Sequence, residues 1–211
     1  ALVLEMMDIL DLRRLIVCDK GIREGMVLDF MDRNKGRLED EKRIRDVRKR
    51  SVMAMARRFS FDEKHALQVA RLAVSLFDQT RGMHRLDAIS RTLLEYSALL
   101  HDIGYLVGYA KHHKHAYYLI VNCGLDGFSP QEVEILANVV RYHRKSFPKN
   151  THSNFARLDK KSQDKVRKLA ALLRLAEGLD RSHSQLVQSL HCRGNGTSLT
   201  LKLHTKEDPE L

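Results

Sequence analysis

Several kinds of residue are scarce in this chain of 211 residues, and each scarcity excludes a class of protein. The 3 cysteines, Cys18, Cys123 and Cys192, are odd in number and far apart, so neither a disulfide framework nor a zinc knuckle is supported. Tryptophan is absent and aromatic residues make up 6%, so the interleaved aromatics of many nucleic-acid modules are not evident. With 3 prolines, 11 glycines and 43% hydrophobic residues, the composition indicates a helix-rich globular chain rather than a disordered or collagen-like one.

Long apolar runs and a balance of charge are lacking too. No stretch approaches the roughly 18 to 20 apolar residues of a membrane span, and the start of the chain has no basic flank before an apolar core. We therefore expect a protein of the reducing cytoplasm. Lys and Arg number 37 against 27 Asp and Glu, a net charge of +10 that favours a polyanionic partner.

Residues 36–186 carry the hydrophobic spacing of α-helices. No strand-like alternation interrupts them, which indicates an all-α domain of several helices joined by short links. Ser60 or Asp62 could cap the first predicted helix, and Ser129 before Pro130 is a typical helix start. Helices are predicted over residues 61–77, 86–100, 114–122, 131–143 and 164–179.

The two ends of the chain show strand-like patterns instead. A short helix within residues 2–10 precedes an apolar run of strand length at residues 15–18 and a glycine-bracketed turn at residues 20–25. Near the other end, residues 188–203 alternate around a Gly-Asn-Gly turn, which predicts a β-hairpin. Because one strand or one hairpin is marginal alone, we expect each to be a piece of a larger sheet.

The sharpest chemical signal is the pair His101-Asp102 at the end of an apolar helix. His65 lies at the edge of the preceding apolar stripe, and Asp180 ends another apolar helix. Two imidazoles and two carboxylates form a mixed nitrogen and oxygen site suited to Mn, Fe, Zn, Ni or Mg. The alternatives are a half-buried His65 bonded to backbone and a purely structural His101-Asp102 pair.

Several ordered motifs carry a family resemblance. The motifs are GIREG at residues 21–25, LLHDIG at 99–104, HHKHAYYLI at 112–120, GFS at 127–129, RYHRK at 141–145 and LRLAEGLDRSH at 173–183. With them, nearly the whole chain is similar to the C-terminal half of the exopolyphosphatase and guanosine pentaphosphate phosphohydrolase (Ppx/GppA) family. The order His, His-Asp, Asp also resembles the signature of HD-domain metal-dependent phosphohydrolases.

The resemblance implies a mainly α fold with an HD-domain-like helical bundle over residues 36–186. Residues 1–35 would be the tail of an upstream actin-like α/β domain, and residues 187–211 the start of a small C-terminal domain that contains the hairpin. Family members hold their main hydrolytic site between two actin-like domains, so the principal catalytic cleft would lie outside this chain. The family suggests a homodimer, which nothing in the periodicity requires.

The resemblance also implies the roles of the four signature residues. His65, His101, Asp102 and Asp180 would bind a divalent metal. Asp102, which could bridge two ions, and His101 would be the catalytic residues. The metal would polarise a phosphoryl oxygen and activate water for attack on phosphorus.

The same resemblance implies a role for two further histidines. His112 and His143 match the extra histidines that some HD proteins use for a second metal. For His112, His113 and His115, a basic, solvated helix start is an equal alternative. The histidines without a predicted role are His84, His152, His183, His191 and His204.

Basic residues gather near these motifs and could bind phosphate chains, because Arg offers bidentate contacts and Lys a point charge. The predicted phosphate-binding residues are Lys111, Lys114, Arg141, Arg144, Lys145, Arg174 and Arg181. For the charged run at residues 42–50 we favour a solvated helix face instead.

The predicted function is hydrolysis of phosphoanhydride bonds in polyphosphate or guanosine pentaphosphate. Two alternatives stay open: a non-catalytic polyphosphate-binding module and a nucleic-acid-binding helical module, which the positive charge would equally permit.

Overall fold

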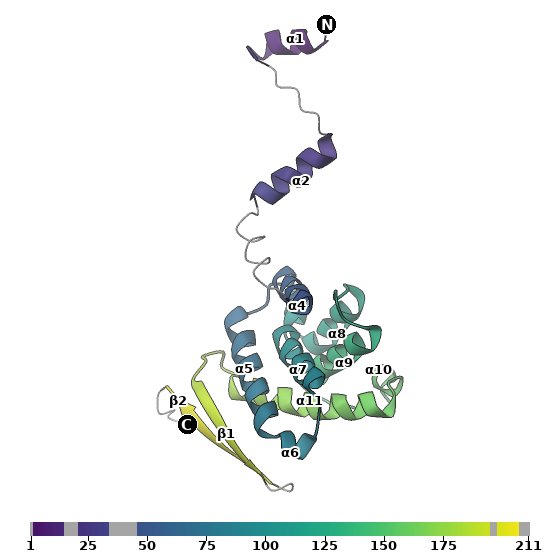
Figure 1. The fold of residues 1–211 in the computed structure, drawn as a ribbon, viewed down its shortest axis with the longest axis vertical. Helices are drawn as coiled ribbons and strands as arrows, with labels where there is room; N and C mark the ends of the chain where they lie inside the picture. The colour runs from purple at the N-terminus through teal and green to yellow at the C-terminus, as the bar shows by residue number, and fades with distance from the viewer. Residues whose placement is uncertain (1, 15–20, 34–45, 195–197, 207–211) are drawn as a thin grey trace. The chain divides into compact units, whose positions relative to one another are not determined.

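The computed structural model describes residues 2–14, 21–33, 46–194 and 198–206 (Figure 1). The chain divides into two compact units, Ala1–Arg45 and Asp46–Leu211, which are described separately below. Among the described residues, none of the helices combines the length and hydrophobicity that crossing a bilayer requires.

The first unit contains the helices α1 (Leu2–Ile9) and α2 (Ile22–Arg33). The predicted glycine-bracketed turn at residues 20–25 is wrong, because α2 begins at Ile22 and the Gly25 amide donates to the Gly21 carbonyl at 3.0 Å. One glycine costs a helix only about 1 kcal/mol, which a run of good helix formers can offset. The predicted strand at residues 15–18, with Cys18, lies outside the described residues.

The second unit is a helical bundle followed by a β-hairpin, which confirms the mainly α fold with a C-terminal hairpin (Figure 1). Its helices are α4 (Val47–Arg58), α5 (Glu63–Gln79), α6 (Arg81–His84), α7 (Ala88–Leu100), the 3-10 helix η1 (Ile103–Leu106), α8 (His112–Asn122), α9 (Pro130–Arg141), α10 (Ser153–Ala156) and α11 (Lys160–Leu179). The strands are β1 (Val187–Gly194) and β2 (Leu199–Thr205).

Side-chain caps explain where two of these helices begin. The Asp62 carboxylate accepts from the His65 amide at 3.1 Å and caps α5, whereas Ser60 has a left-handed φ of 52° and makes no cap. Ser129 caps α9 as predicted, in a capping box with Glu132 whose carboxylate accepts from the Ser129 amide. These caps satisfy amide groups that the first helical turn leaves unpaired.

Other helix ends differ from the prediction by a few residues. α7 begins at Ala88 because Asp87 is its cap, and α11 begins four residues earlier than predicted because Asp159 accepts from the Lys161 and Ser162 amides. α8 begins at His112 rather than at residue 114. α9 ends at Arg141, so His143 lies in the segment after the helix.

Helix α4 includes part of the charged run at residues 42–50 for which the sequence favours a solvated face. The helix packs on α7, and its buried side chains, Val52, Met53, Met55 and Ala56, all lie after that run. Arg48 donates to the Gly127 carbonyl at 2.8 Å and pairs with Glu132 at 2.9 Å. The Arg48 charge therefore joins α4 to the loop before α9, and for this residue the prediction of a merely solvated charge is wrong.

Helix α7 lies at the centre of the bundle and contacts α4, α5, α9 and α11. Its buried side chains include Leu93, Leu94, Leu99 and Leu100. Burial of such side chains stabilises the fold by roughly 1.5–3 kcal/mol each. This packing fixes the C-terminal end of α7, where His101-Asp102 follows.

The hairpin pairs β1 and β2 antiparallel, from Val187↔Thr205 to Gly194↔Leu199. Side chains of α5 satisfy the other edge of β1: Gln68 donates to the Val187 carbonyl at 2.6 Å, and Gln79 donates to the Leu190 carbonyl at 2.9 Å. An isolated two-stranded hairpin is marginally stable. Here the helix supplies the hydrogen bonds that a third strand would otherwise make.

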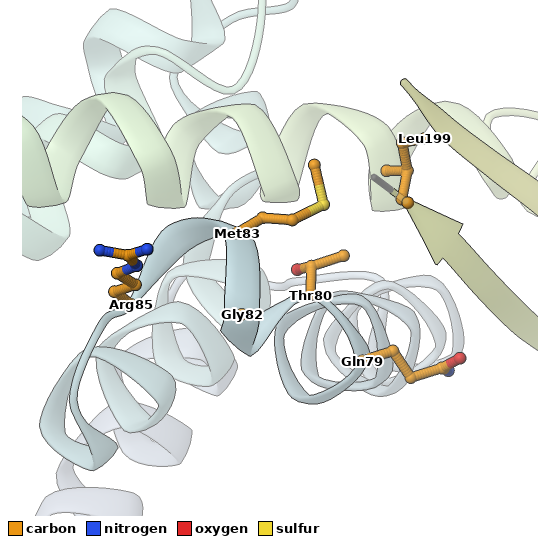
Figure 2. A pocket seen from close by; sticks show the side chains of 7 residues that line it. Gln79, Thr80, Gly82, Met83, Arg85 and Leu199 are labelled. Carbon is orange, nitrogen blue, oxygen red and sulfur yellow. The ribbon is translucent and has the colours of Figure 1, made fainter. Parts of the chain in front are cut away.

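A hollow of about 490 Å³ opens between the end of α5, α6 and the hairpin (Figure 2). Figure 2 shows Met83 reaching toward the hairpin beside Leu199, with Arg85 on the opposite side. The lining residues are Gln79, Thr80, Gly82, Met83, Arg85, Gly194 and Leu199. This lining contains no imidazole, carboxylate or thiolate, and the chemistry described below lies elsewhere.

Candidate metal centre and phosphate site

The ends of several helices bring predicted site residues together. His65 lies in the first turn of α5, His101-Asp102 follows α7, His112 opens α8 and His143 follows α9. All four histidines are at most 2% exposed, and the Asp102 side chain is 12% exposed. Buried polar groups need compensating partners, so this cluster has a specific structural or chemical role.

The Asp102 carboxylate lies between two pairs of imidazoles. Its Oδ2 atom is 3.2 Å from His101 Nε2 and 3.8 Å from His65 Nε2. Its Oδ1 atom is 3.4 Å from His112 Nε2 and 3.8 Å from His143 Nε2. Each carboxylate oxygen thus faces a pair of imidazole nitrogens that come from different helices.

Hydrogen bonds on the other ring nitrogen orient every imidazole. The Nδ1 atoms of His101, His112 and His143 donate to the carbonyls of residues 98, 109 and 140 at 2.7, 3.1 and 2.6 Å. His65 Nδ1 donates to Asp180 Oδ2 at 2.9 Å. A neutral imidazole that donates from Nδ1 carries a lone pair on Nε2, so all four lone pairs are directed into the cluster.

The lone pairs of neighbouring imidazoles lie close to one another. The Nε2 atoms of His65 and His101 are 3.2 Å apart, and those of His112 and His143 are 3.4 Å apart. Two unprotonated nitrogens at that separation repel, whereas a proton or a metal ion between them is bound by both. Together with the carboxylate, this donor set fits a divalent metal that accepts nitrogen and oxygen ligands.

The pKa values of the cluster agree with that electrostatic picture. Burial opposes ionisation of Asp102, but the neighbouring His101, His143 and His112 outweigh burial and hold the pKa of this carboxyl well below its usual range. Burial lowers the pKa of His65 and His112 and lowers that of His143 to about 3. These groups are therefore in the ionised or neutral forms that metal ligands need.

His101 is the exception among the imidazoles. Burial disfavours its charged form, but the charge and hydrogen bond of Asp102 outweigh burial and raise the pKa of His101. The charged form of His101 is thus favoured beside the Asp102 carboxylate, with its Nε2 atom 3.2 Å from His65 Nε2. Metal binding at this position would compete with a proton.

Two further residues, Asp180 and His183, contact His65. Asp180 is 1% exposed, accepts from His65 Nδ1 and accepts from the Gln185 amide at 2.8 Å. The structure therefore places Asp180 behind His65, where a carboxylate orients a metal-binding imidazole and fixes its tautomer.

His183, for which the sequence predicts no role, stacks on His65 with ring centroids 3.6 Å apart and planes 7° apart. Its Nδ1 atom is 2.9 Å from Asp62 Oδ2. A left-handed φ of 57° directs this side chain back to α5. The sequence could have indicated a role for His183 through its position close to Asp180, because both residues lie in the turn that follows α11.

A basic cavity of about 120 Å³ lies next to the cluster. The lining residues are His113, Lys114, Arg141, Tyr142, Arg144, Ser146 and His152. The His113 ring is 5.8 Å from the His112 ring, and burial with the nearby charges lowers the pKa of His113 to about 4. His112 and His113 are both buried, so the alternative of a solvated helix start is wrong for these two residues.

The predicted phosphate-binding residues divide into those that line this cavity and those that do not. Lys114, Arg141 and Arg144 line it. Arg174 instead donates to the carbonyls of Tyr142 and Lys145 at 3.3 and 3.1 Å and fixes the segment after α9. Lys111, Lys145 and Arg181 are exposed and lie outside the lining.

Most of the chain matches a protein-family model. Residues 47–209 match the family model described as Ppx/GppA phosphatase, domain III. The matched range runs from the start of α4 through the hairpin and includes every residue of the cluster around Asp102. The chain therefore belongs to the Ppx/GppA phosphatase family and contains its domain III.

Proposed function

We propose that this chain carries a divalent-metal phosphohydrolase site that acts on polyphosphate or on phosphorylated guanine nucleotides. The observation that carries the proposal is the buried Asp102 carboxylate with an imidazole pair facing each oxygen. Nitrogen and carboxylate donors favour Mn, Fe, Zn or Ni, and Mg would use the carboxylate with water. The family match supports a phosphatase and leaves substrate and metal to be proposed.

In this proposal Asp102 would be shared by two ions. His65 and His101 would complete the first site, and His112 and His143 would complete the second. The first position is supported by His101 Nε2, which lies 3.2 Å from both Asp102 Oδ2 and His65 Nε2. The second is supported by Asp102, His112 and His143, whose ligand atoms lie within 4.8 Å of one another. Asp180, predicted from the sequence as a ligand, is proposed here to orient His65 through the 2.9 Å bond to its Nδ1 atom.

The bound ions would polarise a phosphoryl oxygen and activate the attacking water. Asp102 and His101 are the proposed catalytic residues, since both would hold the ions at the centre and the lowered pKa of Asp102 keeps its carboxylate ionised there. Burial of the imidazoles lowers the local dielectric and strengthens electrostatic interactions with a transferring phosphoryl group.

The basic cavity would bind the phosphates beyond the scissile bond. Lys114, Arg141 and Arg144 supply cations beside His113, whose ring lies 5.8 Å from the His112 ring. Guanidinium groups can make bidentate bonds to phosphate oxygens, which suits a chain of phosphates. We propose that Lys111, Lys145 and Arg181 add a more distant positive field, and that Arg174 acts by holding the cavity wall.

Residues 1–35 and 187–211 enter the proposal as parts of neighbouring domains. The family resemblance implies an upstream pair of actin-like domains with a second, principal hydrolytic cleft. The hairpin belongs to the same compact unit as the helices, and its role as the start of a further small domain stays a prediction. Activity of this chain and activity of a protein with the upstream domains must therefore be measured separately.

Phosphate release from inorganic tripolyphosphate, long-chain polyphosphate and guanosine pentaphosphate tests the proposal. We expect metal-dependent release by the wild-type chain and at least a 100-fold loss in the Asp102→Ala and His101→Ala variants. His191→Ala, which changes an exposed hairpin histidine, is the matched control and keeps full activity. Metal-independent binding of polyphosphate without release would instead favour the non-catalytic module.

A further inference from the structure

An aromatic surface extends outward from the metal centre along the loop after Asp102. The Tyr105 ring centroid is 4.1 Å from that of His112, and the Tyr109 ring follows at 5.5 Å from Tyr105 with planes 25° apart. Tyr109 is 72% exposed, and Leu106 and Val107 beside it are 58% and 57% exposed. The aromatic rings therefore form a continuous row from the proposed metal ligand His112 through Tyr105 to the solvent-exposed Tyr109.

Packing accounts for the inner part of this loop and leaves the outer part unexplained. Ile103 and Gly104 are buried against the bundle. The Tyr109 carbonyl accepts from His112 Nδ1 at 3.1 Å, but this contact involves the backbone and needs no aromatic side chain. The other partly buried tyrosines have polar partners in the bundle, as where Tyr96 donates to Asp46 at 2.9 Å. Exposed apolar groups gathered in one place mark ligand or partner sites more often than scattered ones do.

Charge beside the aromatic surface favours a ligand that is both planar and anionic. Arg144 lines the basic cavity with Lys114 and Arg141, and its electrostatic interaction with Tyr105 and Tyr109 places its charge beside the aromatic rings. A nucleobase stacks on tyrosine faces, and the attached phosphates need metal and guanidinium partners. An inorganic phosphate chain has no surface that could stack on the rings.

We propose that Tyr105 and Tyr109 form a stacking surface for the base of a nucleoside polyphosphate whose phosphates reach the Asp102 centre and the basic cavity. This inference rests on the proposed function and narrows it, because it makes a nucleotide the preferred substrate over bare phosphate chains. Tyr109 is the specificity-determining residue, since its ring is the exposed one. Stacking of one base corresponds to roughly a 5- to 100-fold gain in affinity.

Matched ligands separate the base from the phosphates. We would measure binding and hydrolysis of GTP, ATP and inorganic tripolyphosphate by the metal-loaded full chain, with a 2-aminopurine nucleoside triphosphate as a fluorescent probe of stacking. The variants are Tyr109→Ala, Tyr109→Phe and, as the matched control, Tyr118→Ala, which removes another tyrosine that is 65% exposed.

Tyr109→Ala should weaken nucleotide binding roughly 5- to 50-fold and abolish 2-aminopurine quenching, with tripolyphosphate affinity unchanged. Tyr109→Phe should keep the quenching, and Tyr118→Ala should behave as wild type. Equal effects of Tyr109→Ala on nucleotide and tripolyphosphate, or tighter binding of a single-stranded oligonucleotide than of nucleotide, would overturn the inference. A chain that hydrolyses tripolyphosphate but gains nothing from the base refutes only this inference, whereas one that neither binds nor hydrolyses any of these phosphates refutes the proposed function as well.

Discussion

Gly104 is the position at which a single methyl group should disturb the centre most. It lies in η1, two residues after Asp102, where η1 crosses the first turn of α8. A Cβ atom at this position would lie 2.0 Å from the His112 carbonyl oxygen and 2.7 Å from the Ala116 amide nitrogen. Both are backbone atoms of α8, so no side-chain rotation can relieve the overlap.

The size of the disturbance follows from these distances. The start of α8 must withdraw by roughly 1 Å or more before the carbon and oxygen atoms reach an acceptable separation. Overpacking of this kind costs about 1–3 kcal/mol of the free energy of unfolding. The same movement carries His112 away from Asp102, now 3.4 Å apart, and a misplacement of about 1 Å can reduce catalysis roughly 100-fold.

Thermal unfolding and metal binding of Gly104→Ala measure both effects. For a chain of this size each kcal/mol shifts the unfolding midpoint by about 2–4 °C, so we expect a drop of several degrees together with loss of the second metal. Gly108→Ala is the matched control in the same loop, since a Cβ there meets nothing within 4 Å. A Gly104→Ala chain with the midpoint and metal content of wild type would refute the close approach of η1 and α8.

Two further predictions concern the imidazoles. Asp180→Asn removes the charge that orients His65 and should weaken metal binding about 10- to 100-fold in a chelator competition. Asp126→Asn, which changes an exposed carboxylate, is the control and should bind metal as the wild type does. Equal metal affinities of Asp180→Asn and wild type would contradict the orienting role. The second concerns stability of the metal-free chain against pH. Burial lowers the pKa of His65 and His112, of His113 to about 4 and of His143 to about 3, while Asp102 raises that of His101 against the effect of burial. Four lowered values against one raised value mean that the unfolded chain binds more protons below about pH 6.5, so the urea midpoint should fall between pH 6.5 and pH 4. A midpoint that is flat or rises toward pH 4 would show that these imidazoles are not buried in the neutral form.

The sequence was sufficient for the helical class, the hairpin and most of the cluster. Hydrophobic spacing is a direct consequence of burial, so α5, α7, α9 and α11 are visible in it. The predicted metal ligands His65, His101, Asp102, His112 and His143 come together because each one lies at a helix end, where chain segments converge. Their chain separation could not by itself predict that the ends meet, and the resemblance supplied that information.

Most of the features that the sequence did not predict depend on geometry that no spacing encodes, and one was hidden by neighbouring charges. In α4 the basic residues at both ends obscure a short apolar stripe around Val52 and Met55. The burial of His112 and His113 depends on the packing of α8 against α9 and η1. His183 reaches His65 only through a left-handed backbone conformation, and Asp180 contacts one particular nitrogen of that ring. Arg174 has the charge of a phosphate ligand but satisfies backbone carbonyls instead.

The number of metal ions bound per chain tests the central claim most directly. Equilibrium dialysis against Mn²⁺ or Zn²⁺, followed by elemental analysis, should give two ions for the wild-type chain and for the exposed control His191→Ala. Because Asp102 is shared, Asp102→Ala should lose both ions, whereas His143→Ala should lose one. A wild-type chain without bound metal, or an Asp102→Ala chain that binds as much metal as wild type, would contradict the account.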